Sequence, residues 1–259
     1  MEIKKVYAVY FSPTRGTKKY IEGIAGRISP DFEAIDLTKP KLREKVYIFK
    51  NTDLVIFGVP VYAGRVPSVP DGIFSRIYGN STPAVFNVCY GNRDFDDALL
   101  EEKDLCEENG FKGIAAASWI APHTFSDKVA AGRPDGNDEA KMSEFAKKVK
   151  ALLKKDLDSI KELSIRGNRP YKEVVPMPYH PSGNESCTRC GNCISVCPTS
   201  AVDINDPRKT DNDRCINCLA CVKNCPSHSR NIYNPMFGII IKGIEEKLTA
   251  ERKEHEFFL

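Results

Sequence analysis

The sequence predicts an α/β chain in two parts, a doubly wound parallel sheet followed by a smaller α+β domain built around cysteines. Short apolar runs alternate with helical patterns over residues 1–165, as in parallel sheets whose strands are buried on both faces. Eight of the ten cysteines fall within the second part, expected at residues 183–230. A Pro-rich stretch, residues 166–182, is interpreted as a stiff linker between them. Residues 231–259 are expected to form a helical tail.

Five strands are predicted in the first part, and helical patterns separate several of them. The strands are expected at residues 6–11, 32–37, 53–60, 83–90 and 113–120. Helices are expected at residues 18–28, from about 98 to 109, and at 139–163. This alternation favours the doubly wound strand order 2-1-3-4-5, in which ligands bind at the carboxyl ends of the strands.

Composition and charge limit the classes of function. With 41% hydrophobic residues and no apolar run near the roughly 20 residues that a membrane helix needs, a soluble globular protein without a membrane span is expected. The sequence enters its first strand almost at once, so we expect no targeting segment and a cytoplasmic location. Residues 51–140 carry seven Lys and Arg against fourteen Asp and Glu. This acidic block favours either the docking of a redox partner or a solvated helix face, and argues against nucleic-acid binding.

The cysteines form two identical runs, beginning at Cys187 and at Cys215, that each read C-x2-C-x2-C-x3-C-P. This spacing predicts two cubane 4Fe-4S clusters, because three thiolates of a run bind one cluster and the fourth binds the other. The Pro after each run bends the chain away. The expected ligands are Cys187, Cys190, Cys193 and Cys225 for cluster I, and Cys215, Cys218, Cys221 and Cys197 for cluster II.

Two alternatives to the clusters fit the cysteines less well. Zinc sites use pairs of cysteines separated by a longer loop and close after four ligands, whereas here a third Cys follows at once. A disulfide framework would imply a secreted chain. The segment resembles a bacterial-type ferredoxin with two 4Fe-4S clusters. The remaining cysteines, Cys89 and Cys106, are interpreted as inert buried thiols.

The turn after the first strand is rich in hydroxyl groups and precedes a helix. Such a turn presents backbone N–H groups at the positive end of the helix, which suits a phosphate monoester. Neither a nucleotide P-loop nor a dinucleotide fingerprint is present, and the hydroxyls are also consistent with simple helix caps. The turn resembles the phosphate loop of flavodoxins, S/T-x-T-x-x-T. The residues of this loop are Ser12, Thr14, Arg15, Gly16 and Thr17.

Two further loops follow strands that adjoin the first in the predicted order. In the second loop, Tyr62 is expected to stack on an isoalloxazine ring, Gly64 to let the backbone approach N5, and Arg65 to favour an anionic reduced flavin. A Pro-bounded surface loop is the alternative. The third loop resembles the one that holds the pyrimidine edge of the flavin in flavodoxin-like proteins. Together the loops predict FMN, bound by Pro60, Val61, Tyr62, Ala63, Gly64 and Arg65, and by Tyr90, Gly91, Asn92 and Arg93.

Two other segments carry weaker signals. His123 lies after the fifth strand and would either relay protons to flavin N5 or cap a helix, so that it and Tyr62 are the only catalytic candidates. Residues 237–258 are predicted to be helical, with an apolar stripe that favours packing over the protein rather than contact with a membrane. The stripe consists of Ile240, Ile244, Leu248 and Phe257.

As a whole, the chain resembles the flavodoxin-ferredoxin fusion proteins of anaerobes and departs from short-chain flavodoxins at Arg15 and Arg65. The resemblance implies electron transfer between FMN, two 4Fe-4S clusters and redox-partner proteins. One alternative is an FMN-dependent reductase that acts on a small-molecule acceptor with the clusters as its electron supply. Another is a first domain that binds no flavin and only docks other proteins. The oligomeric state is left open.

Overall fold

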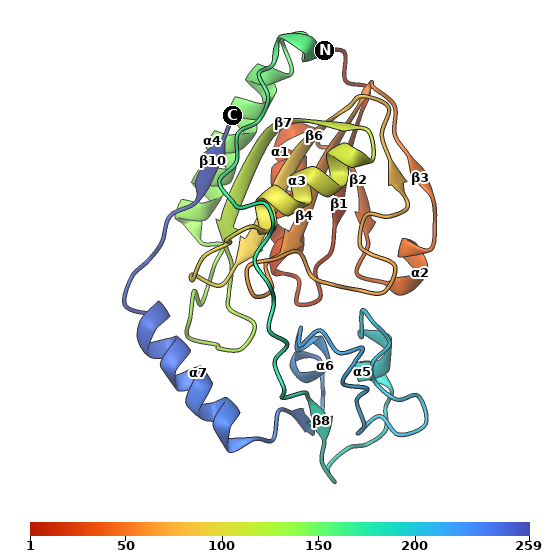
Figure 1. Cartoon of the computed structure of the whole chain (residues 1–259), viewed down its shortest axis with the longest axis vertical. Coiled ribbons are helices and arrows are strands. Elements are labelled where there is room, and N and C mark those ends of the chain that lie inside the picture. Colours follow the sequence, from red (N-terminus) through yellow and green to blue (C-terminus); the bar gives the residue numbers. More distant parts are fainter.

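A six-stranded sheet forms the centre of the larger part of the molecule in this computed structural model, which describes residues 1–259 (Figure 1). The strand order is β10-β7-β6-β4-β1-β2, and the five strands from β2 to β7 pair in parallel. The predicted order 2-1-3-4-5 is therefore confirmed. These strands are β1 (Lys5–Tyr10), β2 (Glu33–Asp36), β4 (Asp53–Pro60), β6 (Thr82–Tyr90) and β7 (Phe111–Ile120).

Helices cover both faces of the sheet. On one face, α1 (Gly16–Ile28) packs against α4 (Gly136–Leu152), and on the other α3 (Ala98–Glu108) packs against β6 and β7. Each face has its own hydrophobic cluster, of 26 and 19 buried residues. The short elements around the sheet are α2 (Pro40–Arg43), β3 (Tyr47–Ile48), β5 (Ile77–Tyr78) and η1 (Leu157–Ser159).

The continuous apolar runs of the sequence correspond to strands buried on both faces. Along β4, Leu54 and Ile56 point into the cluster beneath α1, whereas Val55 and Phe57 point into the opposite cluster. This alternation follows from the two-residue period of a strand. At Gly58, a Cβ atom would lie 2.4 Å from the side chain of Ile21 in α1, so glycine is what lets the helix approach the strand.

The cysteine-rich part lies beyond one end of the sheet, around α5 (Asn192–Ser195) and α6 (Ala220–Lys223) (Figure 1). A two-stranded antiparallel sheet, β8 (Ser182–Gly183) with β9 (Arg230–Asn231), joins its two ends. Left-handed backbone recurs at an interval of 28 residues, which is the interval between the two cysteine runs. The corresponding pairs are Arg189 and Asn217, Gly191 and Leu219, and Ser200 and His228. The two halves therefore share one backbone conformation.

The helix predicted at residues 139–163 is shorter and begins earlier. It begins at Gly136 because Asp135 caps it, accepting the N–H of Asp138 while the side chain of Asp138 accepts the N–H of Asp135. The helix ends at Leu152, and the chain then crosses the edge of the sheet. Leu163 consequently packs in the hydrophobic cluster on the opposite face from α4.

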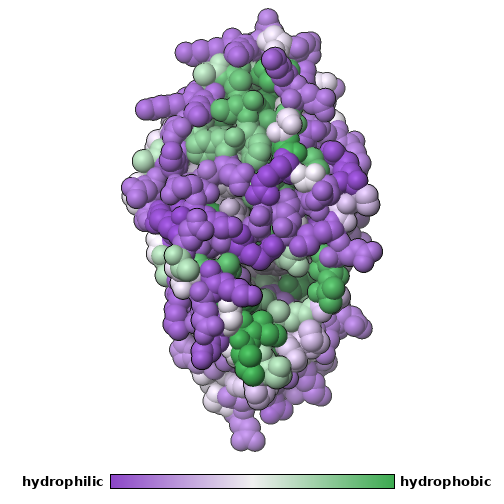
Figure 2. Space-filling view, turned by 60° about the vertical axis from the view of Figure 1, so that its left-hand side comes forward, coloured by the Kyte–Doolittle hydropathy of each residue, from purple (hydrophilic) through white to green (hydrophobic).

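The tail is also not one helix, as was predicted for residues 237–258. Helix α7 (Pro235–Leu248) stops at Leu248, and the chain returns to the sheet as β10 (Glu256–Phe258), which pairs antiparallel with β7. Here Phe257 packs against Trp119 and Phe145 instead of extending a helical stripe. These buried aromatic contacts, and the backbone hydrogen bonds that β10 forms along the otherwise open edge of β7, favour a strand over a continued helix. Helix α7 leaves Met236 and Ile239 exposed, and hydrophobic side chains gather over its region in Figure 2. None of the helices is long and apolar enough to cross a membrane.

A buried carboxyl group lies between α3 and the sheet. The side chain of Glu102 is fully buried, and neither of its oxygens has a hydrogen-bond partner. Burial disfavours the charged form and raises the pKa of Glu102 well above its usual value. Burial therefore favours the neutral form of this carboxyl group in the folded protein, whereas the group ionises freely in the unfolded chain.

This difference predicts a pH dependence of stability. Because the pKa of Glu102 is raised in the folded state, its contribution to the free energy of unfolding is fully present below the pKa of the unfolded chain, about 4.3. This contribution is lost, by up to about 1.4 kcal/mol per pH unit, as the pH rises towards the folded pKa. Glu102→Gln removes this loss, so its advantage over the wild type should grow between about pH 5 and pH 7. Urea unfolding at each pH measures this difference in stability. It can be followed by the fluorescence of Trp119, which is the single tryptophan and is fully buried. Glu108→Gln, at an exposed position of the same helix, is the control. An advantage of Glu102→Gln that does not change with pH would contradict a neutral carboxyl group.

Candidate functional site

The loop after β1 combines a capped helix start with free backbone donors. Arg15 adopts the left-handed conformation with φ of 66°, and α1 begins at the next residue. The hydroxyl of Ser12 accepts the N–H of Lys18 at 2.9 Å, so this side chain caps the helix. The N–H groups of Thr14, Gly16 and Thr17 donate to no protein acceptor. Three backbone donors without a protein acceptor therefore lie at the positive end of a 13-residue helix, as a phosphate site requires.

The three hydroxyl residues of this loop lie in different environments. Thr17 is buried, and its methyl group lies 3.2 Å from the position that a Cβ atom of Gly58 would take. Thr14 is partly exposed, whereas Ser12 is buried by its capping role. Thr14 is therefore the hydroxyl best placed to reach a ligand, and Arg15 is exposed beside it.

The loop after β4 makes a tight turn. Tyr62 and Arg65 exchange two backbone hydrogen bonds, and the residues between them, Ala63 and Gly64, both have positive φ. The guanidinium of Arg65 donates to both carboxylate oxygens of Glu101, at 2.7 and 2.8 Å. This pairing raises the pKa of Arg65 and compensates its charge. The structure thus places Arg65 in an ion pair with α3, where its charge is not free to act on a flavin.

Tyr62 occupies the most unusual environment of the three loops. Its hydroxyl is buried and has no hydrogen-bond partner. Burial raises the pKa of Tyr62 well above its ordinary value, and the nearby thiol of Cys218 contributes in the same direction. An unpartnered buried hydroxyl is costly, by roughly 1–3 kcal/mol. The hydroxyl is therefore an orphaned polar atom that a bound ligand could satisfy.

The loop after β6 differs from the expectation for a flavin-binding loop. Tyr90 is buried in the core against Phe95, and burial raises its pKa to about 12. The side-chain amide of Asn92 is fully engaged with the tail, donating to the carbonyls of Leu248 and Glu251 at 2.7 Å and accepting the N–H of Lys253 at 3.2 Å. The side chain of Arg93 forms an ion pair with Asp96, so only backbone groups of this loop remain available to a ligand.

His123 adjoins this loop. Its Nδ1 accepts the N–H of Phe125 at 3.1 Å, and its ring lies where a Cβ atom of Gly91 would be. Burial, together with the charges of Lys223 and Arg93, lowers the pKa of His123 to about 4. The imidazole is therefore neutral at neutral pH, with Nδ1 occupied as an acceptor.

The cysteines fall into two spatial groups that exchange their fourth members. One cavity is lined by Cys187, Cys190, Cys193 and Cys225, together with Pro207 and Arg230. In the other group, the thiols of Cys197, Cys215 and Cys221 all lie close enough to Cys218 to raise its pKa, to which burial contributes most. The fourth thiol of each run thus lies beside the other run. The grouping of ligands into two clusters remains a prediction.

Hydrogen-bond donors surround the sulfurs of the crossing cysteines. The N–H of Ala201 donates to Sγ of Cys197 at 3.2 Å, and the hydroxyl of Ser229 lies 3.3 Å from Sγ of Cys225. Burial raises the pKa of Cys225, but the hydroxyls of Ser229 and Ser227 outweigh it and lower the pKa to about 6. Donors of this kind stabilise thiolates, the form that binds iron.

Arg230 is a residue that the sequence analysis missed. It is buried between the cysteine groups, and Nη2 donates to the carbonyl of Pro181 at 3.0 Å. Its positive charge acts to lower the pKa of the thiols of Cys193 and Cys221 against the larger effect of burial. In the 28-residue repeat the equivalent position holds Val202. A comparison of the two halves position by position would have revealed this exchange of a valine for an arginine.

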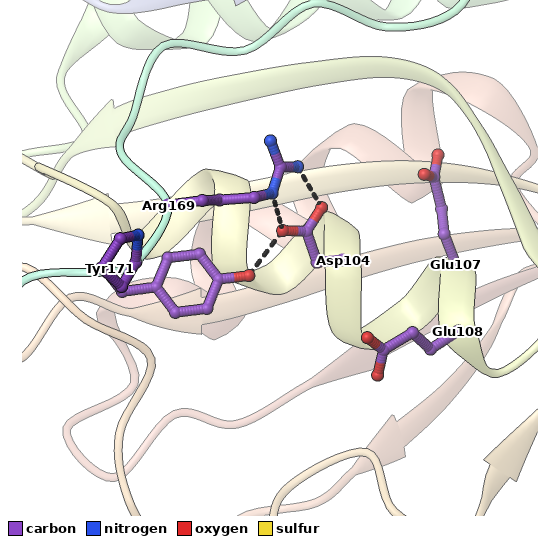
Figure 3. Close-up of a pocket in the computed structure, with 6 residues that line it drawn as sticks. Asp104, Glu107, Glu108, Arg169 and Tyr171 are labelled. Atoms are coloured by element: carbon purple, nitrogen blue, oxygen red, sulfur yellow. Dashed lines mark hydrogen bonds and ion pairs between the residues drawn. The ribbon is translucent and has the colours of Figure 1, made fainter.

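The acidic block binds the linker and does not form the solvated face expected for residues 94–108. Asp104 accepts two hydrogen bonds from Arg169, at 2.8 and 2.6 Å, and one from the hydroxyl of Tyr171, all shown in Figure 3. Asp97 accepts the backbone N–H groups of Asn168 and Lys172 at 2.8 and 2.7 Å. The first half of the linker is therefore fixed along α3.

The tail forms a second attachment. Arg252 pairs with Asp135, while the ring of His255 contacts the buried ion pair of Arg133 and Asp138. Together with the hydrogen bonds of Asn92 described above, the contacts of Arg252 and His255 hold residues 248–256 against the larger domain. The cysteine-rich part is thus anchored to the larger domain on both sides in the sequence.

Comparison with known proteins identifies the smaller part. Residues 186–229 match the family model of the 4Fe-4S dicluster domain, which confirms the ferredoxin prediction for this segment. No curated protein matches the chain. Among solved structures, a chain described as "Structure of a flavodoxin from the domain Archaea" is similar, with 15% sequence identity, coverage of 58% of this chain and 99% of that one, and a TM-score of 0.38. By its own strand order, the larger domain is a flavodoxin-like sheet, joined here to a 4Fe-4S dicluster domain.

The contacts of Asn92 predict that this side chain stabilises the tail. Asn92→Gly keeps the left-handed conformation, φ of 59°, but removes three hydrogen bonds and leaves carbonyls without partners. We expect a loss of roughly 1–3 kcal/mol in the free energy of unfolding, and faster amide exchange over residues 248–256. Asn80→Ala, at an exposed position, should change stability by less than about 0.5 kcal/mol. An Asn92→Gly variant as stable as the wild type would show that these bonds contribute nothing net.

The crossing of the cysteines predicts which cluster a single substitution damages. Cys225→Ala should perturb the cluster bound by Cys187, Cys190 and Cys193 more than the other, because its thiol lines that cavity. Iron analysis and electron paramagnetic resonance of the reduced protein would measure the loss. Cys197→Ala is the matched substitution in the other run. Selective loss of the cluster of Cys218 in the Cys225→Ala variant would overturn the assignment.

Proposed function

We propose that the protein is an electron-transfer iron-sulfur flavoprotein, in which FMN and two 4Fe-4S clusters exchange electrons with each other and with redox-partner proteins. The observation that carries the proposal is the position of the two candidate sites. The three loops at the carboxyl ends of β1, β4 and β6 lie at the end of the sheet beyond which the cysteine-rich domain is placed (Figure 1), and Tyr62 of the second loop is near enough to Cys218 to be influenced by its thiol. A carrier that links two kinds of redox group needs them on facing surfaces of one chain.

The residues of the first loop fit the phosphate of FMN. The free N–H groups of Thr14, Gly16 and Thr17 would donate to its oxygens, and the hydroxyl of Thr14 would add a further donor. The buried hydroxyl of Tyr62 would gain a partner from the ring system. When bound, FMN supplies chemistry that takes up one or two electrons, so it can link single-electron carriers to a two-electron partner.

The remaining site residues hold and orient the groups. Eight cysteines supply thiolates for the clusters, in the ligand sets Cys187, Cys190, Cys193 and Cys225, and Cys215, Cys218, Cys221 and Cys197. Arg230 supplies a buried positive charge between the two sets, which offsets part of the negative charge of thiolate-bound clusters. These features support a role for the smaller domain in carrying electrons.

The environment of His123 favours a carrier over a reductase that protonates a small-molecule acceptor. A neutral imidazole whose Nδ1 already accepts a hydrogen bond has only its Nε2 proton to give, and a pKa of about 4 makes recharging it at neutral pH unfavourable. Tyr62 is a poorer acid still, since its pKa lies well above the ordinary value. Neither catalytic candidate is therefore tuned for proton transfer at neutral pH.

The proposal predicts the cofactor content of the anaerobically purified protein. We expect about one releasable FMN and about eight irons per chain, since each 4Fe-4S site holds four. Thr14→Ala should weaken FMN binding roughly fivefold, as expected for one lost hydrogen bond of about 1 kcal/mol, and leave the iron content unchanged. Ser81→Ala, exposed at the opposite end of β6, should change neither quantity. A chain without FMN after reconstitution would exclude the flavoprotein, and about four irons would exclude two clusters.

A further inference from the structure

The two cysteine groups do not lie equally close to the larger domain. The segment that carries Cys187 and Cys190 makes no hydrogen bond or ion pair to residues 1–165, and Cys190 is exposed. The other group is different. Cys218 and Cys221 are each 8% exposed, much as Cys193 of the first group is at 7%, but the sequence neighbours of this second group contact the larger domain at several points.

Each contact to the larger domain comes from the elements that hold the second group. Ile216 packs against the hydrophobic core beneath α3, and Leu219 belongs to a small cluster that includes Phe125 from the loop after β7. Lys223 of α6 lies 3.4 Å from Asp127 of that same loop. On the first run, only its end takes part: the carbonyl of Pro198, beside the crossing Cys197, accepts Nη2 of Arg43 at 2.6 Å.

These contacts converge on the loops proposed to hold FMN. Val61 and Val66, on either side of the turn after β4, pack in the same hydrophobic cluster as Ile216. The buried hydroxyl of Tyr62 lies close to Cys218, and Lys223 lies close enough to His123 to influence it. The second loop and the segment that carries Cys215 therefore pack against one hydrophobic cluster.

We infer that the clusters have separate roles: cluster II, bound by Cys215, Cys218, Cys221 and Cys197, exchanges electrons with FMN, and cluster I exchanges them with outside proteins. The inference rests on the proposed function and adds the order in which the redox groups exchange electrons. Electrons pass singly between flavin and cluster II, and then between clusters II and I. In each step the donor loses one electron, the acceptor gains one, and no bond forms or breaks. Electrons that passed from FMN to cluster I first would have to enter the smaller domain from its exposed side.

The hydroxyl of Tyr62 is placed to tune both partners of the internal step. Hydrogen bonds and dipoles near a cluster set its potential, and their influence falls with distance. Tyr62→Phe removes only the hydroxyl. Arg189→Gln removes a charge beside exposed Cys190, at the cavity of the first cysteine group. The two substitutions therefore act at opposite ends of the proposed path.

A redox titration of the intact holoprotein tests the order without relying on turnover. Tyr62→Phe should shift the potentials of the flavin and of one cluster, and Arg189→Gln should shift only the other cluster. Tyr78→Phe, a partly exposed tyrosine beyond the opposite edge of the sheet, should shift none of them. If both substitutions shift the potential of the same cluster, or if Arg189→Gln shifts the potential of the flavin, the inference is overturned.

Flash reduction of the bound flavin gives a second test. Cys190→Ala, which damages cluster I, should leave the rate of the first flavin-to-cluster step within about twofold of the wild type. Cys218→Ala, which damages cluster II, should slow that step by at least about a hundredfold. The opposite pattern would place cluster I next to the flavin and overturn the inference while the proposed function stands. Absence of bound FMN in the wild type would instead overturn the proposed function.

Discussion

The parallel pairing of β1 with β4 and of β4 with β6 is the constraint on which both candidate sites depend. It brings the carboxyl ends of three strands to one edge of the sheet, so that three loops far apart in the sequence meet there. Because the strands are buried on both faces, a one-residue slip in register would move each side chain into the opposite hydrophobic cluster and disrupt the packing of both. The packing of the core therefore fixes the position of the loops, and the loops fix where the smaller domain can rest.

The smaller domain depends on a different kind of order. Its hydrophobic cluster is small, with Cys193, Val202 and Cys221 at its centre, and much of its backbone is irregular. Six left-handed residues spaced in pairs by 28 positions give both halves the same loop around their sulfurs. Domains of this size gain much of their stability from bound metal, so we expect the clusters to be part of the fold as well as of the chemistry.

The sequence was informative where the pattern is local. The cysteine spacing and the apolar strands of the parallel sheet could be read directly, because each involves neighbours within about ten residues. The contacts of Asn92 could not, since they join this residue to carbonyls 156 and 159 positions away. Strand β10 has only three residues, too few to show a two-residue period, and was absorbed into a predicted helix. The aspartates of α3 were interpreted as solvated or as a docking surface, because nothing local shows that the linker returns to them.

The return of the tail to β7 affects how the chain is made. The five parallel strands are complete once residue 120 has been synthesised, but the outer edge of β7 stays unpaired until residues 256–258 emerge. In between, the ribosome must produce the whole cysteine-rich domain, so the larger domain waits for the smaller one. The open edge of β7 is a site for mispairing during that interval. Closure of this edge therefore depends on residues that are made well after the rest of the sheet.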